Sequence, residues 1–174
     1  MVVTDLLASL PFVDHDRIGA IGHSAGGHNL VFHMFLDRRI KCGVSSCGLF
    51  SVMNFYAEYA PKRRLAAYAL PELERVGDSA DYLAMVTPRA VRLTRGLWEW
   101  GTDGADRARS EAHVRETRQI EARAREVCAE VGSTGKLEVV YFDEAGGNHD
   151  FPIGVRRDSD AWLERQLGHG RSSG

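Results

Sequence analysis

The sequence predicts an α/β fold in which about four mainly parallel strands are flanked by helices on both faces. Short apolar strands alternate with helical segments along the chain, and such alternation produces parallel strands joined by right-handed crossovers. One strand, near residues 17–22, runs directly into a helix at 25–35 through a sharp turn at Ser24. The chain has 174 residues, a usual length for a single domain.

Composition narrows the classes of function. Hydrophobic residues make up 44% and charged residues 26% of the chain, as in an ordinary globular domain. The net charge of -2 gives no field that would attract nucleic acid or an anionic membrane, so we expect neither as a partner. The 3 cysteines are odd in number and irregularly spaced, which predicts free thiols in a reducing compartment. Without a long apolar run or a signal-like start, a cytoplasmic protein is expected.

The chain begins with a predicted helix at residues 1–10. Its residues Val2, Leu6 and Leu10 are apolar at roughly helical spacing, and Pro11 ends it. A polar turn then leads into the strand before Ser24. We therefore expect no strand ahead of that one.

The remainder of the chain continues the alternation of strands and helices. The aromatic-rich segment 49–86 is interpreted as a lid or pocket insertion in one domain, residues 1–168, and residues 169–174 as a disordered tail. The other predicted elements are strands at 40–47, 89–94 and 137–142, and helices at 79–86, 106–131 and 157–167.

A catalytic motif lies at the sharp turn. Gly22, Ser24 and Gly26 fit the G-x-S-x-G nucleophile elbow, which holds a serine at the tip of a strand-to-helix turn. We expect a Cβ at either glycine to clash with neighbouring backbone. The non-catalytic alternative for Ser24 is a serine that caps the helix and only stabilises it.

A serine hydroxyl needs a base within hydrogen-bond reach, and that base needs an orienting group. His149 lies in the loop after the last predicted strand and is the candidate base. An acid in the loop after the preceding strand would complete the chain order Ser, acid, His. This is the order found in α/β-hydrolases.

These residues resemble the α/β-hydrolase superfamily, and within it the branch of dienelactone hydrolases, acetyl xylan esterases and prolyl oligopeptidases. The resemblance covers nearly all of the chain. It rests on residues 13–18 ahead of the elbow, the elbow at 22–27, Thr87-Pro88-Arg89, the Gly96 loop and residues 148–151.

The resemblance implies roles for individual residues. Ser24 would be the nucleophile and His149 the base. The family's acid commonly lies three residues after a glycine that ends the preceding strand, which selects Glu99 by its distance from Gly96. Three other acids remain open alternatives: Asp103, Asp106 and Asp143.

The oxyanion of the reaction needs preorganised donors. The backbone N–H of Ala25, at the start of the elbow helix, is one candidate. The resemblance places the second donor in a loop upstream of the elbow, where this sequence has only 23 residues. We therefore expect a partial α/β-hydrolase fold, a C-terminal part whose N-terminal strands are absent. The elbow strand would then be an edge at which a second copy or the missing half could pair.

Residues around the predicted triad are candidates for substrate contact. His23 is expected beside Ser24, whereas Phe50 and Trp98 could form the wall of a substrate pocket. His23, His28 and His33 recur every five residues, a spacing that does not align them on one helix face. We therefore expect no metal and no other cofactor.

These features predict a serine hydrolase that cleaves small carboxylic esters through a Ser-His-acid triad and an acyl-enzyme. A serine peptidase of the prolyl-oligopeptidase type is the alternative enzyme. The alternative from another class is a non-catalytic hydrolase fragment that requires a partner chain.

Overall fold

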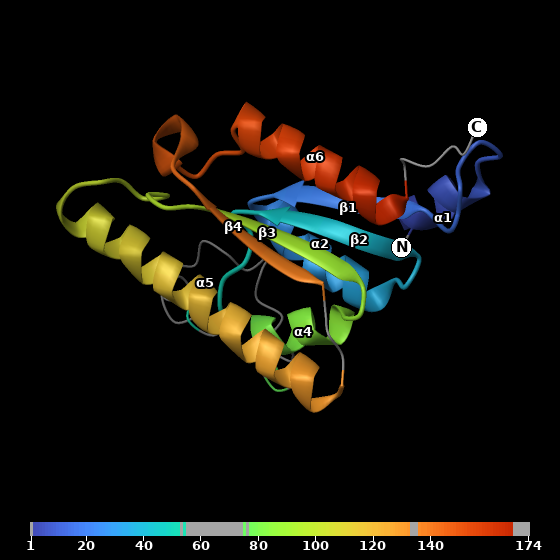
Figure 1. Ribbon diagram of the computed structural model, residues 1–174, viewed down its shortest axis with the longest axis horizontal. Coiled ribbons are helices and arrows are strands. Elements are labelled where there is room, and N and C mark those ends of the chain that lie inside the picture. The colour runs from blue at the N-terminus through green and yellow to red at the C-terminus, as the bar shows by residue number, and fades with distance from the viewer. Residues whose placement is uncertain (1, 53, 55–74, 76, 133–135, 169–174) are drawn as a thin grey trace.

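The structure is a computed structural model that describes residues 2–52, 54, 75, 77–132 and 136–168. Its centre is a parallel sheet of four strands in the order β1-β2-β3-β4, shown in Figure 1. The strands are β1 Ile18–His23, β2 Ile40–Ser46, β3 Ala90–Gly96 and β4 Leu137–Phe142. The predicted α/β class and the parallel sheet are confirmed.

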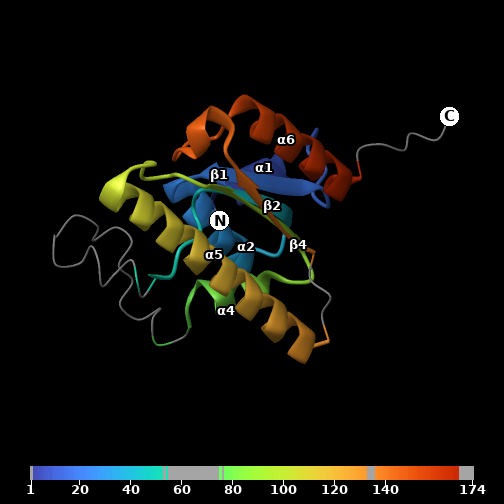
Figure 2. The same ribbon diagram turned by 60° about the vertical axis from the view of Figure 1, so that its left-hand side comes forward.

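Helices cover both faces of the sheet, as predicted. In Figures 1 and 2, α2, α4 and α5 lie on one face and α6 lies on the other. The helical elements are α1 Val2–Ser9, α2 Ala25–Leu36, α4 Ser79–Val86, α5 Gly104–Glu130, the 3-10 turn η3 Glu144–Gly147 and α6 Ile153–Leu167. None of the helices in the described part of the chain combines the length and the apolar character needed to span a bilayer.

The two faces of the sheet form separate cores. On the α2, α4 and α5 face, Met34 and Tyr82 pack with Leu93 of β3, and all three side chains are buried. On the α6 face, Trp162 packs against Cys42 and Val44 of β2. A parallel sheet covered by helices buries side chains on both faces, and every residue of β2 except Lys41 and every residue of β3 is buried.

Some boundaries differ from the predictions. The last helix begins at Ile153, four residues before the predicted start, because Pro152 occupies its N-cap position, where a missing N–H costs no helical hydrogen bond. Strand β3 extends to Gly96, two residues beyond the prediction. Helix α4 confirms the helix predicted within the proposed insertion, but residues 55–74 of that insertion and the tail at 169–174 lie outside the described residues.

One edge of the sheet is open. In the described part of the chain, β1 pairs with β2 and with no other strand. Ile21 of β1 is 44% exposed. The same part of the molecule exposes further large apolar side chains, namely Val2, Val3, Leu6 and Leu7 of α1 and Phe12 after it.

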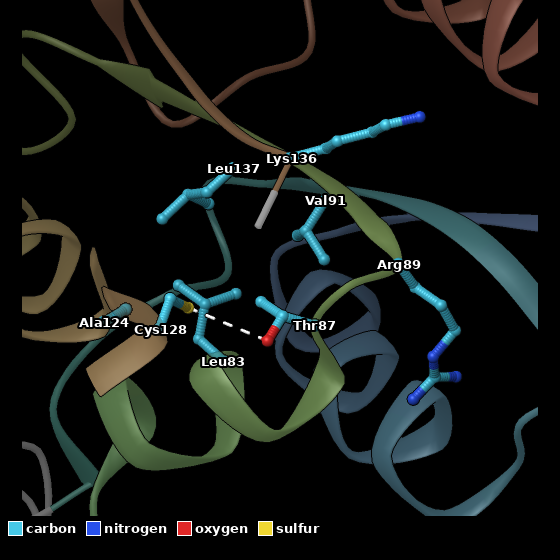
Figure 3. Close-up of a pocket in the computed structure, with 8 residues that line it drawn as sticks. All are labelled: Leu83, Thr87, Arg89, Val91, Ala124, Cys128, Lys136 and Leu137. Carbon is cyan, nitrogen blue, oxygen red and sulfur yellow. Dashed lines mark hydrogen bonds between the residues drawn. The ribbon is translucent and has the colours of Figure 1, made fainter. Parts of the chain in front are cut away.

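The amino ends of β3 and β4 border a small cavity, shown in Figure 3. Its lining is mostly apolar, and the Cys128 thiol lies 3.7 Å from the Thr87 hydroxyl across it. None of the residues predicted to act in catalysis lines it. The residues of interest gather at the opposite, carboxyl end of the sheet.

Candidate active site

Ser24 occupies a strained turn between β1 and α2. Its backbone angles are φ 54° and ψ -120°, a conformation that L-residues rarely adopt. Its N–H donates to the Ser46 carbonyl at 2.8 Å, and its own carbonyl accepts from the His28 N–H at 3.0 Å. The Ser24 side chain makes no capping hydrogen bond, which argues against the purely stabilising role.

The glycines of the turn have unequal roles. A Cβ on Gly22 would lie 2.2 Å from the Gly26 carbonyl oxygen, so this position requires glycine. A Cβ on Gly26 would meet nothing within 4 Å, and the predicted clash there is wrong because Gly26 is on the exposed side of α2. The second crowded position is instead Gly27, where a Cβ would lie 2.9 Å from both the Ser45 hydroxyl and the Ser46 carbonyl oxygen.

His149 follows β4 and η3, on the opposite edge of the sheet from β1, and contacts the elbow. Its Nε2 lies 2.8 Å from the Ser24 hydroxyl oxygen, and its Nδ1 lies 3.3 Å from Oε2 of Glu99. The tautomer with its proton on Nδ1 satisfies both contacts, because Nδ1–H then donates to Glu99 and Nε2 accepts from Ser24. The structure thus brings together Ser24, Glu99 and His149, which are far apart in the sequence.

Close backbone packing connects the loops that carry Glu99 and His149. The Leu97 N–H donates to the Phe142 carbonyl at 2.9 Å, and the Trp98 N–H donates to the Gly147 carbonyl at 2.8 Å. A Cβ on Gly96 would lie 2.3 Å from that same Gly147 oxygen. Only glycine at position 96 lets the two loops approach this closely.

The other candidate acids have different positions. Asp103 is the N-cap residue of α5, Asp106 lies in the first turn of α5, and Asp143 precedes η3. Of the four candidates, Glu99 is the one whose carboxylate contacts His149.

Comparisons with known proteins agree with this geometry. The model of the prolyl oligopeptidase family matches residues 1–85, which include the elbow. No curated protein is significantly similar in sequence. Solved structures of α/β-hydrolases match nearly the whole chain. The chain has the fold of these α/β-hydrolases.

Three structures illustrate the match to the α/β-hydrolase fold. The glucuronoyl esterase from Solibacter usitatus has a TM-score of 0.65 and 17% identity, over 95% of this chain and 46% of that one. The acylaminoacyl peptidase from Pyrococcus horikoshii has a TM-score of 0.68 and 17% identity, over 99% and 28%. The 2,6-dihydroxy-pseudo-oxynicotine hydrolase has a TM-score of 0.60 and 18% identity, over 98% and 46%. The chain therefore spans less than half the length of each of these α/β-hydrolases.

Electrostatics at this site favour a charged Glu99. The Glu99 side chain is only 3% exposed. Burial opposes its ionisation, but the hydrogen bond with His149 and the positive charge of Arg95 outweigh burial and hold the pKa of Glu99 below its ordinary value. Glu99 is therefore a carboxylate at neutral pH, the form that can accept the Nδ1 proton of His149.

Sequence reasoning missed the role of Arg95. This arginine lies in β3, and its Nη1 is 2.8 Å from Oε2 of Glu99. A charged residue inside a strand that is otherwise buried, four positions before a candidate acid, was the available signal. A buried strand arginine of that kind needs an anionic partner, because an unpaired buried charge is costly.

Cys47 adjoins the same group. The ligand atoms of Cys47, Glu99 and His149 lie within 4.8 Å of one another, and among the described residues this is the cluster that could hold a metal ion. A metal needs the thiolate. Burial, and then the nearby charge of Glu99, raise the pKa of the Cys47 thiol to about 12. Since Arg95 also binds the Glu99 carboxylate, the residues fit a hydrogen-bonded triad better than a metal centre.

The three residues predicted to contact a substrate have different neighbours. The His23 ring lies 5.1 Å from the His149 ring, and its Nδ1 is 3.1 Å from the Ser46 hydroxyl. Phe50 stacks on His28, with ring centroids 4.4 Å apart. Trp98 joins the triad loops through its backbone. Contact of these residues with a substrate stays a prediction.

The three histidines of the elbow region do not converge. His23 faces His149, and burial together with the His149 charge lowers the pKa of His23. His28 is buried, and burial lowers its pKa to about 4. His33 lies exposed further along α2.

Proposed function

We propose that this chain is a serine hydrolase that cleaves small carboxylic esters, with Ser24 as nucleophile, His149 as base and Glu99 as the orienting acid. The observation that carries the proposal is the continuous hydrogen-bonded path from the Ser24 hydroxyl through both nitrogens of His149 to Glu99. The esterases among the matched structures support an ester as the substrate.

The chemistry follows from the contacts. The Ser24 oxygen attacks the ester carbonyl carbon while its proton passes to Nε2 of His149. The resulting oxyanion is stabilised by the N–H of Ala25, because Ala25 is the first residue of α2 and the first N–H groups of a helix have no partner within it. Collapse expels the alcohol, which takes the proton from His149. Water, deprotonated by His149, then hydrolyses the acyl-serine and restores the hydroxyl.

A fluorophosphonate probe tests the proposal, because it forms a covalent bond with activated serines. We expect labelling of the chain at Ser24, and a loss of at least about 10⁴-fold in labelling rate in Ser24→Ala. Ser9→Ala, which changes an exposed serine of α1, is the matched control and should label normally. A folded wild-type chain that the probe does not label would contradict the proposal.

The family match over residues 1–85 supports a second candidate, a serine peptidase of the prolyl-oligopeptidase type. The same triad would attack a peptide carbonyl and protonate the amine that leaves. Parallel assays with acyl esters and with peptide amides of matched acyl groups separate the two. Faster turnover of the esters by more than the intrinsic reactivity difference favours the esterase.

The open edge of β1 supports a third candidate, a hydrolase part that needs another chain. Ile21 is 44% exposed on that edge, and the matched structures are more than twice as long. In this case residues 1–168 are the C-terminal part of the domain, and strands from a second polypeptide extend the sheet next to β1 and supply the second oxyanion donor. Folded protein that the probe labels only after a partner is added would establish this candidate.

A further inference from the structure

Arg95 is a buried cation with two specific contacts. It lies in β3, where every residue is buried, and its side chain is 4% exposed. Its Nη1 lies 2.8 Å from Oε2 of Glu99, and its Nη2 donates to the carbonyl oxygen of Leu49, which follows β2. Removing a guanidinium from water costs several kcal/mol unless it is paired and hydrogen-bonded. The guanidinium is therefore held in one orientation by residues that follow β2 and β3.

The contact between Arg95 and Glu99 also affects His149, because Arg95 and His149 share one oxygen of the carboxylate. Oε2 of Glu99 faces both Arg95 Nη1 and His149 Nδ1, whereas Oε1 is buried and makes no hydrogen bond within the described residues. Without Arg95, the neutral groups His149 and Cys47 would remain as partners of the carboxylate, and no cation would face it at Oε2. The two amino nitrogens of Arg95 form a fork between Oε2 of Glu99 and the Leu49 carbonyl, and the rigid guanidinium therefore fixes where Oε2 lies.

We propose that Arg95 is a positioning residue of the triad, one that orients the Glu99 carboxylate toward His149 and offsets part of its negative charge. The inference rests on the proposed serine chemistry for its catalytic meaning. Arg95 touches neither Ser24 nor His149 in the hydrogen bonds of the site, so it acts through Glu99.

The proposal predicts a change in pH dependence when the charge is removed. In Arg95→Met, the buried carboxylate loses its cation, so a proton is held more strongly by the coupled pair of Glu99 and His149. Since His149 must be unprotonated to act as base, the acid limb of the labelling profile moves to higher pH. We expect labelling by the fluorophosphonate to fall about tenfold or more near pH 7 and to recover as pH rises, because one pH unit in the midpoint corresponds to tenfold.

A matched control is present in the same strand. Arg92 is also buried in β3, but its Nη1 donates to the Asp158 carbonyl at 3.2 Å and its Nη2 contacts the carboxylates of Asp158 and Glu138. Arg92→Met therefore removes a buried arginine without touching the triad. We expect it to lower stability and to leave the midpoint of the pH profile in place. A pH-independent loss in Arg95→Met, or equal midpoint shifts in both variants, would overturn the proposal.

Two further measurements keep the proposal testable. Arg95→Lys retains the charge and loses the fork, so labelling should slow by less than tenfold at an unchanged midpoint, while Arg92→Lys labels like the wild type. If Arg95→Met does not fold, equal labelling in the two lysine variants overturns the proposal. NMR titration of the His149 imidazole in wild type, Arg95→Met and Arg92→Met gives the midpoint without any reaction at Ser24. An unshifted His149 titration in folded Arg95→Met overturns the positioning role, whereas absent labelling of the wild type overturns only the serine chemistry.

Discussion

The two flanks of Ser24 are built differently. On the flank toward β3 and β4, a buried ion pair, two tightly packed loops and His149 converge on the serine. On the flank toward β1, the sheet ends at a strand whose Ile21 is exposed. We call these the closed flank and the open flank. The ion pair on Glu99 comes from the closed flank, as do Glu99 and His149 themselves.

The hydrogen-bonded residues Ser24, His149 and Glu99 thus do not depend on the open flank, whereas other parts of a hydrolase site could. The proton path needs only the carboxyl ends of β1, β3 and β4, all of which this chain contains. Oxyanion donors and pocket walls can come from any element next to the elbow, and the open flank leaves room for them. The comparison predicts that substitutions on the closed flank lower stability or probe labelling strongly, and that equivalent substitutions on the open flank lower them little.

The largest expected effect is at Gly96 on the closed flank. In Gly96→Ala, the new Cβ would lie 2.3 Å from the Gly147 oxygen and 2.5 Å from the Asn148 oxygen, so the loop that carries His149 must move. We expect about 4 kcal/mol of lost stability, measured by urea denaturation, together with loss of probe labelling. The control is Gly26→Ala in α2, where nothing lies within 4 Å and alanine should add about 0.5–1 kcal/mol. Similar stability of the two variants would break the comparison.

The next largest effect is a pH dependence of the stability that arises from His28, which is buried against Phe50. Its pKa in the fold is about 4, below the ordinary 6.5, so the unfolded chain takes up this proton first. The stability contribution is complete above pH 6.5 and is lost as pH falls toward 4, by about 3 kcal/mol for this group. His28→Phe keeps an aromatic ring on Phe50 and should remove that part of the loss between pH 7 and pH 4.5.

Urea denaturation at the two pH values measures the His28 effect. The same substitution at His33, on the exposed side of α2, is the control for a general response to replacing histidine. If wild type and His28→Phe lose the same stability on acidification, the buried imidazole is not the cause.

The smallest expected effect compares two residues that face each other across β1 and β2. Ile21 and Val44 are partners in the parallel register, yet Ile21 is 44% exposed and Val44 is 0% exposed. Val44→Thr places a hydroxyl in the α6 core and should cost about 2 kcal/mol. Ile21→Thr should change stability by less than about 0.5 kcal/mol, as expected for a surface position. Thermal unfolding measures both, and a large loss in Ile21→Thr would mean that the edge is covered in solution.

Much of the fold could be predicted because its signals are local. The short segments of β2 and β3 have strand length, and the capping residue Asp78 marks the start of α4. Helix boundaries are predicted less accurately. The predicted helix at 157–167 leaves Pro152 outside it, although proline is favourable at the start of a helix, and α6 begins directly after Pro152.

At the site, the sequence by itself determined which candidate residues are present and at which strand ends they lie. A serine in an elbow pattern, a histidine in the last loop and an acid in the loop before it follow from residue types and from their positions after strands. What it left open was the choice among Glu99, Asp103, Asp106 and Asp143, because each of these acids comes after a strand and the sequence does not show where the backbone directs its carboxyl.

The tertiary structure brings Glu99, and not the other three acids, into contact with His149, and it sets the surroundings of the site. Glu99 contacts His149 because Gly96 lets two loops meet, and Asp103 instead begins α5. The Arg95 ion pair, the neutral thiol of Cys47 and the exposed edge of β1 also appear only in three dimensions. The physical reason is that burial and charge pairing are properties of neighbours in space, whereas the sequence records neighbours along the chain.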